Sequence, residues 1–224
     1  SKSHAILAEV EEAVSKFLFL SVDHVVRGGS VGKGTAIFGQ ADAELVFFLR
    51  GLPPSPEGMW LPGLVRAVGG VLSQQLDGDD LFEEVEVAAD GVRLCARGLE
   101  SVFLRFSPVF NSHAEAVQSL ASVPVAARRR GAAALAEERV QFIARQPGLV
   151  KGTIRLIKWW RDGQIWSGPS SKPPDAVIEL ASIYSAAQSG PKDQRAAVSA
   201  VLAILSRLSD VRVVWSNYYS RGDI

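Results

Sequence analysis

The chain contains 224 residues, of which 24 are basic and 24 are acidic, so its formal net charge is zero. Apolar residues make up 47% of the sequence, which is enough for a substantial core and excludes an intrinsically disordered chain. The single cysteine, Cys95, excludes a disulfide framework or a thiolate metal site, and the apolar runs are too short to cross a membrane. We therefore expect an intracellular, cytoplasmic protein without membrane insertion, formed by one large domain or two lobes.

The first half of the chain combines helical and strand patterns. Two segments repeat apolar residues at helical spacing, and a continuous apolar run at 45–49 is typical of a central strand buried on both faces. Residues 82–110 alternate apolar and polar positions around two tight turns, which predicts a meander of three strands. The expected elements are helices at 3–20 and 61–76 and strands at 24–27, 45–49 and within 82–110.

From residue 113 onward the pattern is helical. One of these segments begins at Pro173–Pro174 and ends at Gly190, and helices commonly begin at proline and end at glycine. The expected elements are helices at 127–145, 148–163, 173–190 and 193–208, followed by an extended piece at 211–219. We therefore predict a strand-rich lobe with an N-terminal helix at residues 1–112 and a helical lobe at residues 113–224.

The stretch "GGSVGKGTAIFGQADAELVFFL", residues 28–49, carries the clearest chemistry. Gly28 and Gly29 would let the backbone approach phosphate oxygens, and Ser30 adds a hydroxyl. Asp42 and Glu44 are two residues apart on a predicted strand, so they point to one face, as carboxylates that clamp metal ions for nucleotidyl transfer must. The alternative is a hairpin with a solvated acidic face.

Three further segments join this stretch in a resemblance to a known family. "VVRGGSVGKGTAIFGQADAELVFFL" resembles the signature of the 2′-5′-oligoadenylate synthetases, which belong to the nucleotidyltransferase superfamily together with innate-immune cyclic-dinucleotide synthases. "GTIRLIKWWRD", "KPPDAVIELASIYS" and "VRVVWSNYY" resemble later segments of the same family, in the same order. The resemblance runs through most of the chain.

The resemblance implies an α+β nucleotidyltransferase fold, in which a lobe with a mixed, twisted sheet packs on a helical lobe with a cleft between them. Family members join ATP units through 2′-5′ linkages with Mg²⁺ when double-stranded RNA activates them. By position, Asp42 and Glu44 match metal ligands. Ser30, with Gly28 and Gly29, matches the phosphate-contacting turn, and Lys158 matches a nucleotide-contacting lysine.

The resemblance also suggests where RNA would bind. Arg27, Lys33, Arg145 and Lys151 occupy places comparable to family RNA contacts, which neutralise phosphates without reading sequence. The first predicted helix, however, is acidic. We therefore expect any binding of double-stranded RNA to be weak.

Three positions depart from the family pattern. The second carboxylate is Glu44 rather than Asp, and its extra methylene displaces the oxygens by roughly 1 Å, which catalytic geometry tolerates poorly. The third catalytic Asp, in a family strand reading V-x-F-D-V-x-P-A-F, is replaced by Arg105 in "VFLRFSPVF". A base-holding tyrosine is replaced by Ala176, and the preceding glutamine by Asp175. We expect the Arg105 guanidinium to lie within hydrogen-bond reach of Asp42 or Glu44, where it would stand in for metal charge. If the strand register were different, Arg105 would point to solvent.

Two functions are compatible with these residues. In the first, the protein is a pseudoenzyme and has no cofactor. It binds double-stranded RNA, a nucleotide such as ATP, or other protein subunits. In the second, it is an active Mg²⁺-dependent enzyme that makes 2′-5′-linked oligoadenylate. Arg105 and Ala176 favour the first.

Overall fold

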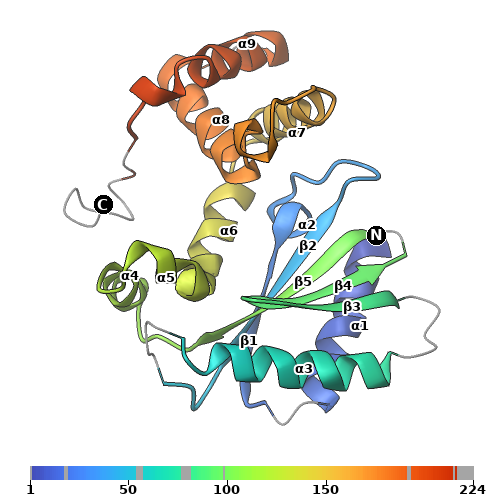
Figure 1. The fold of residues 1–224 in the computed structure, drawn as a ribbon. Helices are drawn as coiled ribbons and strands as arrows, with labels where there is room; N and C mark the ends of the chain where they lie inside the picture. Colours follow the sequence, from blue (N-terminus) through green and yellow to red (C-terminus); the bar gives the residue numbers. More distant parts are fainter. Residues whose placement is uncertain are drawn as a thin grey trace. The chain divides into compact units, whose positions relative to one another are not determined.

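The computed structural model describes residues 2–17, 20–53, 58–76, 82–97, 99–190, 193–213 and 215 (Figure 1). The chain folds into two compact units, Ser1–Gln141 and Phe142–Gly222. We call them the sheet unit and the helical unit. Among the described residues, no helix is long and apolar enough to cross a membrane.

The sheet unit is built around five strands in the order β1-β2-β5-β4-β3. Strands β2 and β5 are parallel, and the other neighbours are antiparallel, so the sheet is mixed. The predicted central strand at 45–49 is confirmed, because it lies within β2, and the three-strand meander is β3, β4 and β5. The strands are β1 (Val22–Gly28), β2 (Asp42–Leu49), β3 (Phe82–Ala88), β4 (Gly91–Ala96) and β5 (Leu99–Pro108).

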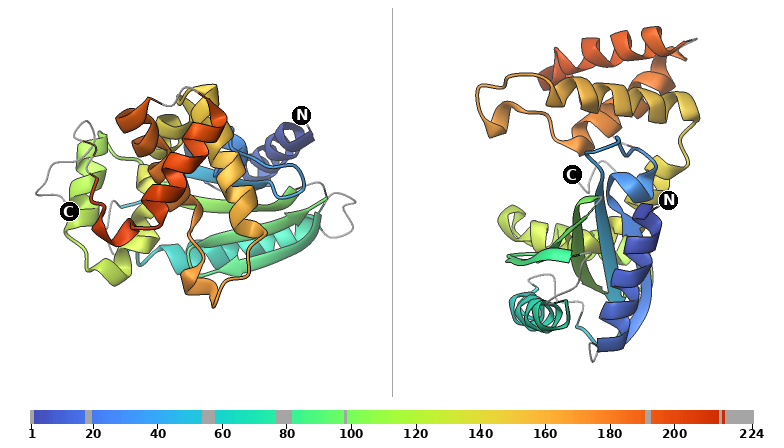
Figure 2. Two further views of the ribbon diagram at one scale, coloured as in Figure 1. Left: turned by 90° about the horizontal axis from the view of Figure 1, so that it is seen from above. Right: turned by 90° about the vertical axis from the view of Figure 1, so that its right-hand side faces the viewer.

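Helices cover both faces of this sheet. The alternation of β2 directs Leu45 and Phe47 into the main core, which α1 (Lys2–Phe17) and α3 (Leu61–Gln75) complete. The right-hand view of Figure 2 shows α1, in dark blue, against the sheet. On the other face, Val46 and Phe48 pack on a second, smaller cluster. That cluster is completed by Ala133 and Ala136, from η1 (Ala132–Leu135) and α6 (Ala136–Ala144).

The helical unit packs three long helices around a separate apolar core that includes Ile154, Ile178 and Val201. As predicted, α8 begins after the two prolines and ends before Gly190, which adopts φ +51. The long helices are α7 (Gly148–Asp162), α8 (Asp175–Ser189) and α9 (Gln194–Leu205), with short turns η2 (Pro169–Ser171) and η3 (Leu208–Asp210).

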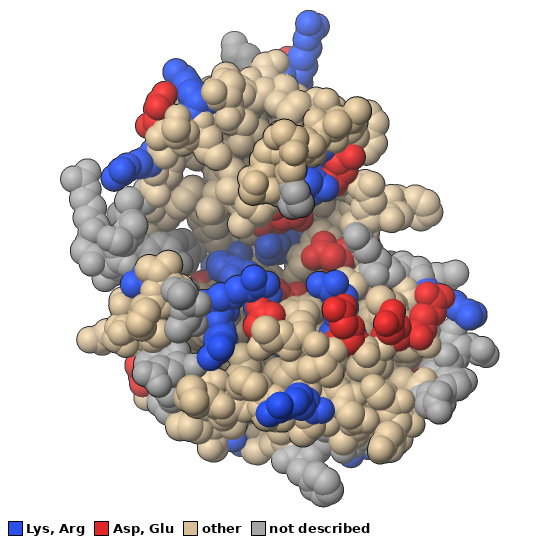
Figure 3. All heavy atoms as spheres, viewed as in Figure 1, with Lys and Arg blue, Asp and Glu red and all other residues tan. Residues whose placement is uncertain are grey.

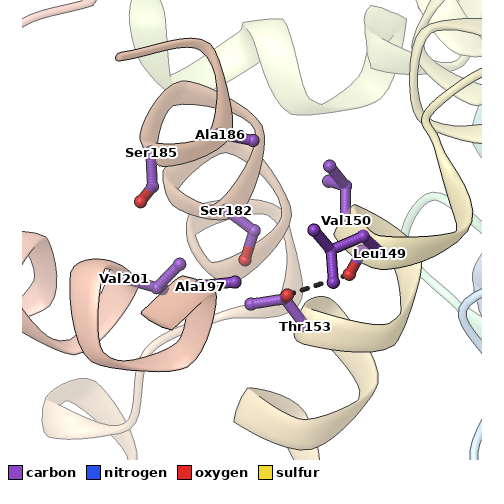
Figure 4. Close-up of a pocket in the computed structure, with 8 residues that line it drawn as sticks. All are labelled: Leu149, Val150, Thr153, Ser182, Ser185, Ala186, Ala197 and Val201. Atoms are coloured by element: carbon purple, nitrogen blue, oxygen red, sulfur yellow. Dashed lines mark hydrogen bonds between the residues drawn. The ribbon is translucent and has the colours of Figure 1, made fainter. Parts of the chain in front are cut away.

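A water-sized cavity lies inside the helical unit (Figure 4). Thr153, Ser182 and Ser185 present hydroxyls to it, from α7 and α8. The first two hydroxyls donate to helix carbonyls one turn earlier, as the dashed line from Thr153 to Leu149 shows. The hydroxyl of Ser185 is buried without a hydrogen-bond partner. The cavity is too small for anything larger than a single water molecule.

Two sequence predictions differ from the structure in detail. The helix expected at 127–145 is interrupted, because α5 (Val125–Gly131) passes through the 3₁₀ turn η1 before α6 begins. The extended piece expected at 211–219 lies mostly outside the described residues, and residues 211–213 form no strand.

The two lobes were predicted to meet at residue 112, where strands do give way to helices between β5 and α4 (His113–Ala121). The compact units, however, divide after Gln141. The reason is that η1 and the start of α6 bury Ala133 and Ala136 against the sheet. The segment 113–141 is therefore helical in structure but belongs to the sheet unit.

Candidate nucleotide and metal site

The strand register brings Arg105 next to the predicted acidic pair. Val46 of β2 is paired with Arg105 of β5, so Arg105 shares a sheet face with Glu44. Its Nε atom lies 2.7 Å from Glu44 Oε1, so the two side chains form a close ion pair. The Nε–H bond is not directed at that oxygen, so the contact is not a hydrogen bond. The Arg105 side chain is 22% exposed. The alternative in which Arg105 points to solvent is therefore wrong.

Asp90 completes this arrangement and was not recognised from the sequence. It lies in the turn between β3 and β4, is 6% exposed, and accepts a hydrogen bond from Arg105 Nη1 at 3.1 Å. Arg129 of α5 donates to the same Oδ2 atom at 3.2 Å. We call Glu44, Asp90, Arg105 and Arg129 the arginine cluster. Asp90 lies in one of the two tight turns that the sequence predicts within residues 82–110, but no local pattern indicates that its side chain would be buried beside Arg105.

The arginine cluster also involves an aromatic ring. The guanidinium carbon of Arg105 lies 4.8 Å from the centroid of Phe103, its neighbour two residues earlier on the same face of β5. A cation over an aromatic face is attracted by the ring quadrupole. The guanidinium is thus held by two carboxylates and a ring, as a fixed internal charge rather than a mobile surface group.

The glycine turn has a structural requirement of its own. Gly29 adopts φ +67, and a Cβ there would lie 2.8 Å from the Ala43 backbone. A Cβ on Gly28 would lie 2.9 Å from Glu44 Oε2. Both glycines therefore allow the turn and the short helix α2 (Gly29–Lys33) to pack directly on the start of β2.

Ser30, the predicted phosphate contact, is also engaged within the protein. It is 5% exposed, and its hydroxyl donates to the carbonyl of Asp42 while accepting from the N–H of Asp42, both at 3.1 Å. The backbone N–H of Ser30 donates to Asp42 Oδ1 at 3.2 Å. The turn thus holds the first predicted metal ligand in place, with the serine hydroxyl already satisfied.

The carboxylates do not fit the two-metal site that the family resemblance implies. By the resemblance, such a site takes three acidic residues, whose charge must be available to metal cations. Here Glu44 is paired with Arg105, Asp90 is bonded to two guanidinium groups, and Asp42 holds the glycine turn. Within the described part of the chain, no group of three or more His, Cys, Asp or Glu side chains is arranged to hold a metal ion.

Lys158, the predicted nucleotide contact, is buried in the helical unit. Its side chain is 4% exposed, and Nζ lies 2.6 Å from Asp175 Oδ2 and 2.9 Å from Glu179 Oε1. Burial disfavours the charged ammonium, but the two carboxylates outweigh it and raise the pKa of Lys158. Asp175 stands where the family has glutamine, so a negative charge has been added beside this lysine. The exposed Ala176 follows it.

Arg161 extends this ion-pair network toward the α7–α8 loop. It bonds to Asp175 at 2.5 Å and to Asp162 at 2.8 Å, and Lys172 lies 2.8 Å from Asp162. Burial acts to raise the pKa of Asp175, but its bonds to Lys158 and Arg161 lower it overall. The pKa of Asp162 is lowered in the same way, against burial, by Arg161 and Lys172.

Acid should weaken the helical unit through these two carboxylates. Because the folded state lowers the pKa of Asp175 and Asp162 below the ordinary 3.8, their contribution to stability is present above that value and is lost as the pH falls below it. We expect the helical circular dichroism to melt at a lower temperature at pH 3 than at pH 7. Asp175→Asn should show a smaller acid shift, and an equal shift in both proteins would contradict the assignment.

The four predicted RNA contacts are divided between the two units. In the sheet unit, Arg27 forms two bonds to Glu11 of α1, at 2.6 and 3.0 Å, and these bonds raise its pKa. Lys33 ends α2. In the helical unit, Arg145 is exposed and Lys151 donates to the Ala144 carbonyl. On the face drawn in Figure 3, some basic side chains lie next to one another and acidic side chains lie beside them.

Known proteins share this fold. A structure of E. coli MS115-1 CdnC with ATP matches with a TM-score of 0.65 and 17% identity, covering 100% of this chain and 70% of that one. The E. coli MS115-1 CdnC:HORMA-deltaN complex matches with a TM-score of 0.63 and 17% identity, covering 98% of this chain and 68% of that one. Terminal uridylyl transferase 4 from Trypanosoma brucei with bound UTP matches with a TM-score of 0.53 and 12% identity, covering 90% of this chain and 64% of that one. The fold is therefore that of the nucleotidyltransferases.

Sequence comparison indicates which kind of nucleotidyltransferase this chain resembles. Residues 113–223 match the family described as 2′-5′-oligoadenylate synthetase 1, domain 2, C-terminus. 2′-5′-Oligoadenylate synthase 3 of Mus musculus is 26% identical over 232 residues, which cover 91% of this chain and 20% of that protein, and the Rattus norvegicus protein is 24% identical with the same coverage. Both comparisons support a nucleotidyltransferase of the 2′-5′-oligoadenylate synthetase type, and the chain spans about a fifth of the length of these relatives.

Proposed function

We propose that this protein is a catalytically inactive family member that acts in the cytoplasm as a binding module. The observation that carries the proposal is the ion pair between Arg105 and Glu44. A guanidinium occupies the position of the third carboxylate, where the reaction needs negative charge to hold metal and to accept a proton. The same cation is paired with Glu44, one of the two acidic residues that are retained at the site.

A nucleotide such as ATP and a second protein subunit are the proposed ligands. CdnC was solved with ATP and also in complex with HORMA-deltaN, which supports both classes of partner for this fold. Lys158 would meet a nucleotide with its charge already compensated by Asp175 and Glu179. We therefore expect any nucleotide to bind weakly through its phosphates.

The purified protein should make no oligoadenylate from ATP and Mg²⁺, with or without double-stranded RNA. The physical reason is the absence of a third carboxylate at residue 105. Radiolabelled ATP followed by chromatography measures the product, with an active family member as the positive control. Because Asp42 and Glu44 are retained, the second candidate is an active Mg²⁺-dependent synthetase, and product formation at a rate comparable to the control would establish it instead.

Double-stranded RNA should bind weakly and without sequence preference. The formal net charge is zero, and Arg27 is already paired with Glu11, so few phosphates can be neutralised. We expect a dissociation constant no tighter than about 10⁻⁶ M at physiological salt. A gel-shift titration measures it, and Glu11→Gln, which releases Arg27, should tighten binding. Nanomolar affinity of the unaltered protein would overturn this expectation.

A further inference from the structure

The helical unit contains an open cavity of about 470 Å³ beside the α7–α8 loop. It adjoins the ion-pair network around Lys158, because Lys172 lines the cavity and is paired with Asp162 at the edge of that network. Its volume falls within the range of about 300 to 1,000 Å³ that is typical of small-molecule sites. Its apolar wall includes Trp160, Trp166, Pro174, Val177, Leu205 and Leu208.

Ion pairs and hydrogen bonds hold the loop that forms one side of this cavity. Arg161 Nη1 donates to the Pro173 carbonyl at 3.0 Å, and Trp166 Nε1 donates to the Arg161 carbonyl at 2.8 Å. Lys172 Nζ lies 2.8 Å from Asp162. Because both ends of the loop are tied to α7, the wall is formed before any ligand arrives, which lowers the entropy cost of binding.

Two tryptophans give the cavity a preference for flat ligands. The rings of Trp160 and Trp166 meet edge to face, with centroids 6.2 Å apart and planes 87° apart. Trp166 is fixed by its hydrogen bond, whereas Trp160 remains 36% exposed and Leu208 41% exposed. A planar ring that covers them would remove this apolar surface from water and gain stacking contacts.

The polar groups of the wall define the rest of the ligand. Ser206 donates its hydroxyl proton to the Ala203 carbonyl, which leaves its oxygen able to accept from a ligand N–H. The Ser171 hydroxyl is already engaged, because it donates to the Gly168 carbonyl and accepts from the Gly168 N–H and the Ser167 hydroxyl. Lys172 can donate further hydrogen bonds, but Asp162 compensates its charge. The wall therefore offers hydrogen bonding without net charge, which disfavours a strongly anionic ligand such as a nucleoside triphosphate.

We propose that this cavity binds an uncharged planar heteroaromatic molecule that carries an N–H donor and an adjacent carbonyl acceptor. The ring stacks on Trp160, and the polar edge faces Ser206 and Lys172. This site does not depend on catalysis or on the arginine cluster, so it stands or falls independently of the function proposed above.

Quinolin-2(1H)-one is a suitable probe, because it is planar, neutral and carries both polar groups. Ligand-observed NMR titration of the whole chain should give saturable binding with a dissociation constant of about 1 mM or tighter, as expected for a fragment of this size. Trp160→Ala should weaken binding by about tenfold, since a stacking partner is lost. Val177→Trp, which fills the cavity from α8, should abolish it.

Trp159→Ala is the matched control. Trp159 precedes Trp160 on the same helix and is 65% exposed, but it does not line the cavity. This variant should bind the probe as the unaltered protein does, and circular dichroism should verify the fold of all three variants. The proposal is overturned if no saturable binding occurs, if Trp159→Ala loses as much affinity as Trp160→Ala, or if a folded Val177→Trp protein still binds. It is also overturned if the ring-saturated lactam of the same size binds equally well.

Discussion

Replacing Lys158 with methionine should lower the free energy of unfolding of the helical unit by about 3–5 kcal/mol. Glu179 is 1% exposed and lies 2.9 Å from the Lys158 ammonium, so the substitution leaves a buried carboxylate without that partner. Asp175 is affected less, because Arg161 still bonds to it. Urea unfolding followed by circular dichroism measures the loss. A change below about 1 kcal/mol would show that the pair behaves as an exposed one.

Two variants separate the buried charge from the side chain itself. In Lys158→Met combined with Glu179→Leu, both charges of the pair are removed, and most of the lost stability should return because no carboxylate remains unpaired. Lys172→Met removes a lysine that is 44% exposed and pairs with Asp162, so its effect should stay below about 1 kcal/mol. If the double variant is no more stable than Lys158→Met, loss of packing rather than charge explains the result.

Replacing Arg105 with alanine should cost up to about 3 kcal/mol in the sheet unit. Glu44 and Asp90 have side chains 15% and 6% exposed, and both would lose their contact with the inner guanidinium. Arg129→Ala is the matched control, since Arg129 bonds to the same oxygen of Asp90 but is 82% exposed. We expect its cost to be well under about 1 kcal/mol. Equal effects of the two substitutions would contradict the role of Arg105 as an internal charge.

Arg105→Asp should create a dependence on magnesium that the unaltered protein lacks. The substitution places a third carboxylate beside Glu44 and Asp90, where like charges repel unless a cation binds. Thermal melts should show the variant destabilised in chelator and stabilised by added Mg²⁺. Arg105→Asn, which removes the guanidinium without adding a carboxylate, should not respond. If magnesium does not change the melting temperature of Arg105→Asp, the proposal that Arg105 replaces metal charge is wrong.

The sequence by itself determined the features that depend on neighbouring residues. The continuous apolar run of β2 required burial on both faces, and the alternation at 82–110 required paired strands. The i, i+2 spacing of Asp42 and Glu44 placed both on one strand face, and the position of Arg105 within "VFLRFSPVF" placed it on an adjoining strand. Backbone period and turn residues are local properties, so the strand-rich and helical parts of the chain could be predicted from them. The nucleotidyltransferase fold itself was implied by the resemblance of the motifs to a known family.

Only the tertiary structure decided which charges meet. Asp90 is 15 residues from Arg105 and 39 from Arg129, yet one of its oxygens bonds to both. Arg27 was predicted as an RNA contact but is paired with Glu11, 16 residues away on α1. Lys158 was predicted as a nucleotide contact but is held by Glu179, 21 residues away on α8. Such pairs depend on how helices and strands pack through space, and neither the period of a segment nor its composition contains that information.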